Sequence, residues 1–290
     1  MPAGKLLAAA VLTVSVSACS GQSIVTSTAH PKSSSVSVVP RTEAPDRSTT
    51  ASPRRSKHSE PHPGSSSART VFSGVTIGID PGHNGRNASD PSYLNHQIWN
   101  GREQEACDTT GTETNGGYPE WRFTFRVSSY LAADLRKAGA HVVMTHTTAN
   151  GVGPCVDRRA RIIDAARAAV AIDIHADGGP PGGRGFAVLE PVPDRVNNNV
   201  VAASRAYARD VRRAFLRTGM PLSTYDGING LQPRDDLAGL NLTTVPKVLI
   251  ECGNMRNATD AAMLTSPSFQ HRAARALMSS MAAFLTKSHG

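Results

Sequence analysis

Four polar side chains stand where the sequence could support metal chemistry. His83 follows an Asp-Pro-Gly run, Glu120 follows Pro119, His175 lies within the run IDIHAD, and Glu251 follows an apolar Val-Leu-Ile run. Two neutral imidazoles and one carboxylate can hold Zn²⁺ and leave a fourth position open for water, as catalytic zinc sites do. A single histidine after a strand is usually an ordinary polar loop residue. The metal interpretation therefore depends on these side chains meeting in the fold.

Short apolar runs rich in β-branched residues predict the strands that would carry these side chains. The runs lie at residues 75–80, 141–145, 170–174 and 245–250. Each is short enough for a buried strand, and the first ends at a Pro-Gly turn.

Helical patterns separate the expected strands. Apolar residues recur every four positions from Phe123 to Leu135, and a second apolar face comprises Ile162, Ile163, Ala166 and Ala169. Two further helices are expected near residues 198–217 and 268–286. Alternating strands and helices predict an α/β fold: a single domain with a twisted, mostly parallel sheet flanked by helices on both faces. In such a sheet the active site lies at the carboxyl ends of the strands.

The N-terminal residues predict export. Lys5 precedes the apolar run 6–16 and the small residues that follow it, so residues 1–18 are predicted to be a signal peptide. The four residues that end at Cys19 resemble a bacterial lipobox, in which this cysteine is lipidated and becomes the mature N-terminus. Ordinary cleavage after Ala18 is the alternative.

The next segment differs in composition from the rest of the chain. Residues 19–70 are rich in Ser, Thr, Pro and Arg, have no apolar periodicity, and are predicted to be a disordered linker. Much of the net charge of +8 lies in this linker. Residues 71–290, the expected folded domain, are therefore close to neutral. This distribution and the export signal argue against a nucleic-acid partner.

Four blocks of the folded part match a known family. They are IGIDPGH at 77–83, the Pro-Glu pair that ends at Glu120, the run from Arg159 to Asp177, and VPKVLIECGN at 245–254. Together they resemble the zinc-dependent N-acetylmuramoyl-L-alanine amidases of bacterial cell-wall turnover, the amidase 3 catalytic type. The resemblance extends from Val75 to the C-terminus and indicates a minimal, actinobacterial-like catalytic domain.

The resemblance implies a role for each candidate residue. His83, Glu120 and His175 would bind one Zn²⁺, and Glu251 would be the catalytic general acid/base. The substrate would be peptidoglycan or its muropeptide fragments, cleaved between the lactyl group of N-acetylmuramic acid and L-alanine. The sequence departs from the family pattern in three places: Asn84 replaces the usual Gly, Asp173 replaces a common Ser, and residues 254–257 (NMRN) replace a more apolar block.

Other polar residues are weaker candidates. Glu103, Glu105 and Glu113 in the long loop after His83 are rival ligands, but a helix start fixes a carboxylate better than a mobile loop. Asp80 is either the partner of a ligand histidine's second nitrogen or a turn residue that caps Gly82. Arg234, Asp235 and Asn241 lie in a polar loop and are candidates for contact with glycan or peptide.

Three cysteines remain after export. Cys107 and Cys155 lie in Gly- and Thr-rich loops and form the natural disulfide pair, whereas Cys252 lies in an apolar strand and is expected to be a core residue. Because neighbouring strand residues point to opposite faces, the Cys252 thiol should point away from Glu251.

Alternative functions share parts of this pattern. Another exported zinc peptidase or deacetylase would use the same chemistry, but no HExxH motif is present. A non-catalytic wall-binding lipoprotein would keep the fold without needing zinc. We expect a monomer in the cell envelope, in contact with peptidoglycan and anchored to the outer face of the cytoplasmic membrane if Cys19 is lipidated.

Overall fold

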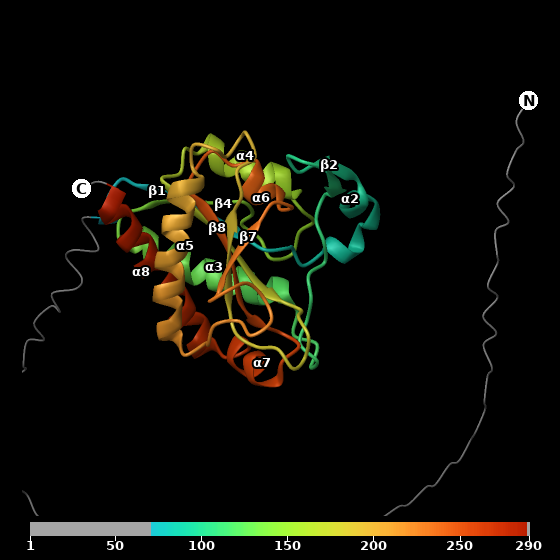
Figure 1. Ribbon diagram of the computed structural model, residues 1–290. Helices are drawn as coiled ribbons and strands as arrows, with labels where there is room; N and C mark the ends of the chain where they lie inside the picture. The colour runs from blue at the N-terminus through green and yellow to red at the C-terminus, as the bar shows by residue number, and fades with distance from the viewer. Residues whose placement is uncertain (1–70, 289–290) are drawn as a thin grey trace, which may run out of the picture. The chain divides into compact units, whose positions relative to one another are not determined.

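The computed structural model describes residues 71–288, so the expected signal peptide, Cys19 and the linker lie outside the described residues (Figure 1). Six strands form the main sheet in the order β4-β1-β5-β8-β6-β7. Their bounds are Thr76–Pro81 (β1), His141–Met144 (β4), Val170–Asp177 (β5), Ala187–Pro191 (β6), Leu231–Arg234 (β7) and Lys247–Asn254 (β8). Strands β4, β1, β5 and β8 are parallel, whereas β6 is antiparallel to β8 and parallel to β7. The expected mostly parallel sheet is confirmed.

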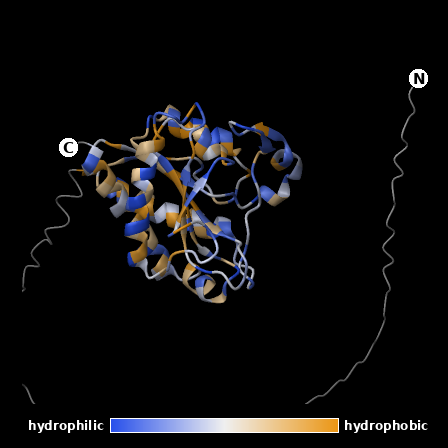
Figure 2. Ribbon diagram, viewed as in Figure 1, coloured by the Kyte–Doolittle hydropathy of each residue, from blue (hydrophilic) through white to orange (hydrophobic). Residues whose placement is uncertain are grey.

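Helices cover both faces of this sheet, as expected (Figure 1). One face packs against α3 (Glu120–Lys137), α5 (Val201–Phe215) and α8 (Pro267–Ser288), and this interface forms the largest buried apolar cluster. The other face is covered by α4 (Val156–Ala165) and the short α6 (Ala238–Asn241) over two smaller apolar clusters. Figure 2 shows hydrophobic strands inside and hydrophilic residues on the outer sides of α5 and α8. Apolar burial therefore holds the helices to the sheet.

Because side chains alternate between the two faces along each strand, the two faces of the sheet carry different residues. In β5, Val170, Ile172 and Ile174 belong to the cluster under α3, α5 and α8. The intervening Asp173 and His175 must point to the opposite face, because successive strand residues alternate. In β8 the same rule separates Ile250 and Cys252 from Glu251. The core position expected for Cys252, pointing away from Glu251, is confirmed.

Several elements differ from the expectations. The helix expected around residues 162–169 begins earlier, at Val156, and ends at Ala165, and Arg167 beyond its end has a left-handed φ of 49°. The helices expected near 198–217 and 268–286 are confirmed as α5 and α8. Strands β6 and β7 were not expected. The remaining elements are Asn87–Ser89 (η1), Pro91–Asn95 (α2), Gln97–Trp99 (β2), Gln104–Ala106 (β3), Leu216–Thr218 (η2) and Ala258–Leu264 (α7).

Strands β2 and β3 pair antiparallel to form a separate two-stranded sheet within the long loop between β1 and α3. None of the helices in residues 71–288 is long and apolar enough to cross a membrane.

Candidate active site

The structure brings His83, Glu120 and His175 together at the carboxyl ends of the parallel strands. His83 follows β1, His175 lies near the end of β5, and Glu120 is the first residue of α3. One ligand atom from each residue lies within 4.8 Å of the others. Glu120 bridges the two rings, with Oε2 at 3.1 Å from His83 Nε2 and Oε1 at 3.0 Å from His175 Nδ1. This is the donor set that catalytic Zn²⁺ sites use.

Backbone groups fix the Glu120 carboxylate. The amide of Thr112 donates to its Oε2 at 3.0 Å, and the amide of Ala176 donates to its Oε1 at 3.1 Å. Gly111 allows the loop to pass this close. Its φ is +74°, and a β-carbon there would lie 2.7 Å from His83 Cδ2 and 2.8 Å from Glu120 Oε2. The site therefore depends on a residue without a side chain at this position.

Glu120 and His83 shift each other's pKa in opposite directions. Burial disfavours the Glu120 carboxylate, but His83 and His175 outweigh burial and hold its pKa below the ordinary range. Burial also favours a neutral His83 ring, yet Glu120 and Asp108 raise its pKa to about 10. A buried carboxylate that binds positive charge this strongly makes the centre attractive to a cation.

Glu251 lies beside this centre on the neighbouring strand. It is opposite His175 in the register of β5 and β8. Its Oε2 is buried without a hydrogen-bond partner among the described residues. Burial and the nearby carboxylates of Glu120 and Asp177 raise the pKa of Glu251 well above its ordinary value. An acid with a raised pKa and a free oxygen is suited to exchange a proton with a substrate or water.

The rival carboxylates Glu103, Glu105 and Glu113 are not part of the cluster of possible ligands. Glu105 instead accepts a hydrogen bond from Asn100 at 3.1 Å.

Of the three candidates in the polar loop before β8, Asn241 differs from the expectation, whereas the side chain of Asp235 is exposed and its contact with substrate stays a prediction. Asn241 is fully buried and donates to the Asp235 carbonyl, and Arg234 pairs with Asp236. These residues stabilise their own loop, and Asn241 is not accessible to glycan.

Neither interpretation of Asp80 is correct. Its Oδ1 accepts from Arg159 at 3.0 Å and from the Thr145 hydroxyl, and its Oδ2 lies 3.6 Å from Lys247 Nζ. Asp80 therefore belongs to a buried ion network behind the site. Asp173 joins the same network, with Oδ1 at 2.8 Å from Lys247 Nζ, which explains how an acidic residue is accommodated where the family commonly has Ser.

Arg159 and Lys247 are the functional neighbours that sequence reasoning missed. Both are almost completely buried, and between them they neutralise the carboxylates of the ion network. Lys247 is the single basic residue of the apolar run 245–250, which is a signal in the sequence, whereas nothing distinguishes Arg159 from Arg158 and Arg161 beside it. Asn84, another departure from the family pattern, accepts from the amides of Gly85 and Gly151 and donates to the Gly153 carbonyl, and so holds the loop after His83.

A cavity of about 250 Å³ opens beside the two histidines. His83 and His175 line one side, and Leu237, Ala238 and Leu249 form an apolar wall. The ion network also contributes to the lining through Asp80, Arg159 and Asp173, whereas Glu120 and Glu251 do not line this cavity.

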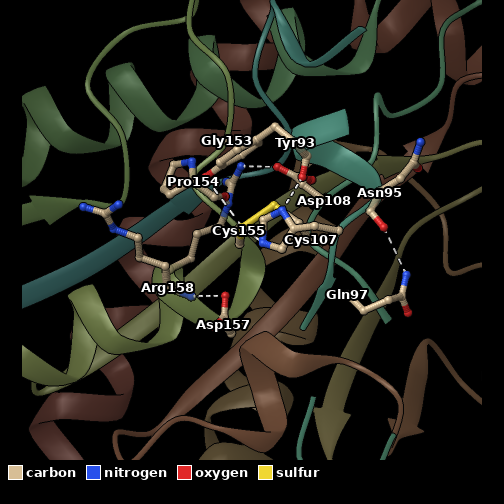
Figure 3. Close-up of a disulfide and its surroundings, with 12 residues drawn as sticks. Tyr93, Asn95, Gln97, Cys107, Asp108, Gly153, Pro154, Cys155, Asp157 and Arg158 are labelled. Carbon is tan, nitrogen blue, oxygen red and sulfur yellow. Dashed lines mark hydrogen bonds and ion pairs between the residues drawn. A yellow bond between two sulfur atoms is a disulfide. The ribbon is translucent and has the colours of Figure 1, made fainter. Parts of the chain in front are cut away.

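The expected disulfide is confirmed between Cys107 and Cys155 (Figure 3). It joins the residue that directly follows β3 to the residue that precedes α4.

The fold and the site define a class: α/β proteins with two histidines and a glutamate at the strand ends and a second glutamate on the next strand. The comparisons with known proteins agree. A model of the amidase 3 type, described as N-acetylmuramoyl-L-alanine amidase, matches residues 77–283. The chain belongs to this family, and the expected resemblance is confirmed.

Several relatives are similar over most of this part. An N-acetylmuramoyl-L-alanine amidase of Mycobacterium tuberculosis is 40% identical over 215 residues, which cover 74% of this chain and 88% of the relative. The crystal structure of an N-acetylmuramyl-L-alanine amidase from Mycobacterium smegmatis has a TM-score of 0.71 at 39% identity and covers 74% of this chain and 99% of its own. The apo structure of the corresponding amidase from Mycobacterium abscessus has a TM-score of 0.70 at 40% identity, with 74% and 100% coverage.

Proposed function

We propose that this chain is a zinc-dependent hydrolase of peptidoglycan or muropeptides. It cleaves the amide bond between the lactyl group of N-acetylmuramic acid and L-alanine. His83, Glu120 and His175 hold one Zn²⁺, and Glu251 is the catalytic general acid/base. The observation that carries the proposal is the cluster of three donors within 4.8 Å, with Glu251 opposite His175 in the strand register.

The donor set fits zinc in number and type. Two imidazoles and one carboxylate leave a position for water or for the substrate carbonyl, and neutralise only one of the two positive charges. When bound, zinc would act as a Lewis acid that polarises the scissile carbonyl and lowers the pKa of water from 15.7 to about 7. The amides that fix Glu120 would keep its carboxylate aimed at the centre.

Glu251 moves the proton in this mechanism. A free Oε2 accepts a proton from the attacking water as the new C–O bond forms at the lactyl carbonyl. Glu251 then donates the proton to the nitrogen of L-alanine as the C–N bond breaks. Its raised pKa supports the first step, because a carboxylate with a higher pKa is a stronger base toward the attacking water.

The test is hydrolysis of a defined muramoyl peptide with and without a chelator, with products identified by mass spectrometry. We expect release of a peptide with a free L-alanine amino terminus, loss of activity in chelator, and recovery with Zn²⁺. Cleavage within the peptide would instead favour the peptidase alternative. Absence of zinc binding would contradict the proposal and favour a non-catalytic wall-binding protein.

The proposal includes export to the cell envelope. Residues 1–18 would act as the signal peptide, and the chain would either carry lipid on Cys19 or be released by cleavage after Ala18. Residues 19–70 would then be the tether of a monomeric catalytic domain. Mass measurement of the mature N-terminus distinguishes the lipidated from the free form, and an uncleaved N-terminus in the producing cell would contradict export by this route.

A further inference from the structure

His83 needs support that β1 alone does not provide. It lies beyond the end of the strand with a φ of 60°, a left-handed conformation that is unfavourable for a residue with a side chain. Its Nε2 faces Glu120 at 3.1 Å, so Nδ1 is the nitrogen left to hold the ring in place. A histidine that binds metal through one nitrogen needs an acceptor for the proton on the other.

The acceptors for His83 Nδ1 come from residues 107–109. The Thr109 carbonyl oxygen lies at 3.2 Å and Asp108 Oδ1 at 3.5 Å. Asp108 also shapes the carbonyl's position, because its Oδ1 accepts from the Thr109 amide at 2.7 Å. The Asp108 carboxylate thus acts on the ring directly by charge and indirectly through the backbone of the next residue.

The second oxygen of Asp108 is anchored to the body of the domain. Arg159 Nη2 donates to Asp108 Oδ2 at 2.6 Å, and both side chains are almost completely buried. The same guanidinium donates through Nη1 to the Pro81 carbonyl at 2.6 Å. Arg159 therefore connects the end of β1, just before His83, to the loop that faces the His83 ring.

The Cys107–Cys155 disulfide joins the two segments that carry Asp108 and Arg159. Cys107 immediately precedes Asp108 (Figure 3), and Cys155 lies one helical turn before Arg159. The Val156 amide donates to the Cys107 carbonyl at 2.8 Å, so backbone and sulfur atoms join the same two segments. The covalent bond keeps Asp108 within reach of Arg159.

We propose that Asp108 is a positioning residue for His83, held by Arg159 and by the Cys107–Cys155 disulfide, and that this clamp sets the affinity of the site for zinc. The inference rests on the proposed function, since His83 is a ligand only if the metal binds. Removing a partner of this kind lowers metal affinity by about 10- to 100-fold.

The experiment measures Zn²⁺ affinity of the metal-free protein by competition with a chromophoric chelator. Asp108→Asn is expected to weaken binding about 10- to 100-fold. The pair Cys107→Ser/Cys155→Ser is expected to weaken it in the same direction by a smaller factor. Asp157→Asn is the matched control, because its carboxylate pairs with the exposed Arg161 and accepts from the Arg158 amide without contacting His83 or Asp108, and it should leave the affinity unchanged.

Two further readouts separate positioning from a general structural role. The ¹⁵N shift of the protonated His83 Nδ1 should differ between the zinc complexes of Asp108→Asn and of the unaltered chain, because this nitrogen no longer faces a charged carboxylate. A purely structural role would lower the melting temperature of the metal-free protein and leave zinc affinity and ring shifts unaltered, which would overturn the inference. If Asp108→Asn does not fold, the cysteine pair carries the test, and unaltered affinity in that variant overturns the role of the disulfide.

The outcomes for the unaltered chain are distinct. If it binds no zinc, the proposed function fails. If it binds zinc and Asp108→Asn binds equally well, only the positioning role of Asp108 fails.

Discussion

The two faces of the central sheet differ sharply in what they bury. The face under α3, α5 and α8, here called the apolar face, packs Ile172, Ile174 and Ile250 into one continuous cluster. The face under α4 and α6, here called the charged face, buries Lys247 and Asp173 from the same two strands. Alternate residues of one strand therefore have different roles: one set packs the core and the other set carries the buried charges.

The difference shows how one sheet can combine stability with a reactive site. Burial of aliphatic side chains on the apolar face is favourable without any directional requirement. On the charged face a buried ion needs a partner: Lys247 Nζ lies 2.8 Å from Asp173 Oδ1, whereas Glu251 Oε2 has no hydrogen-bond partner among the described residues. Substitutions on the two faces should therefore affect different measurements.

The largest effect is expected for Glu251→Gln on the charged face. The amide cannot accept and return the proton, so turnover of a muramoyl peptide should fall about 10²- to 10⁴-fold while zinc content is retained. Cys252→Ala, the next residue but on the apolar face, is the matched control and should retain turnover. Similar losses in both variants would show that the two faces are not functionally separate.

A second large effect is expected for Lys247→Met. The substitution leaves Asp173 and Asp80 without their shared ammonium group, and should cost about 3–5 kcal/mol of unfolding free energy, measured by urea denaturation. The double variant Asp173→Ser/Lys247→Met removes the carboxylate that loses its partner, since Asp80 keeps Arg159, and should recover part of the loss. A double variant less stable than Lys247→Met would contradict this account of the ion network.

Acidic pH should lower the free energy of unfolding by protonating the buried carboxylates that pair with Arg159. Although burial opposes their ionisation, Arg159 holds the pKa of Asp108 at about 2 and that of Asp80 lower still, whereas an unfolded Asp titrates near 3.8. A folded pKa below the unfolded one gives stability that is present above about pH 4 and lost as the pH falls toward 2. For Asp108 in the metal-free protein this amounts to about 2 kcal/mol. Denaturation at pH 7 and pH 3 tests it, and equal stabilities would contradict it.

The smallest effect is expected for Ile174→Val on the apolar face. Loss of one methylene from a fully buried side chain should cost about 0.5–1.5 kcal/mol without changing zinc affinity. Chemical denaturation and chelator competition on the same sample check both parts. A change in zinc affinity would mean that packing on the apolar face affects metal binding on the charged face.

The sequence predicted the parts that obey local periodicity. The β-branched runs marked β1, β4, β5 and β8, and the residues that follow or end such runs include His83, His175 and Glu251. The carboxyl ends of parallel strands meet at one edge of a sheet. The sequence alone therefore predicts that these three side chains lie close together. Glu120 was preferred over its rivals for a different local reason: the start of a helix fixes a carboxylate better than a mobile loop does.

The sequence did not predict the features that depend on long-range pairing. Strands β6 and β7 are short, and their partners are set by the sheet rather than by their own pattern. The partners of Asp80 were misjudged because Arg159 and Lys247 reach it from distant elements. The role of Asp108 was invisible for the same reason, since nothing near it in the sequence marks a contact with His83.

The in-register pairing of His175 with Glu251 restricts how this protein can change in length. Deleting one residue of β8 before Glu251 would exchange the faces of the residues beyond it, placing Cys252 in the site and turning Glu251 toward the apolar cluster, and a deletion in β5 would displace His175 in the same way. Insertions in the segment between β1 and α3 carry no such penalty, provided that Asp108 and Gly111 keep their places. Evolutionary drift in length should therefore concentrate in that segment, while both strands keep a constant residue count.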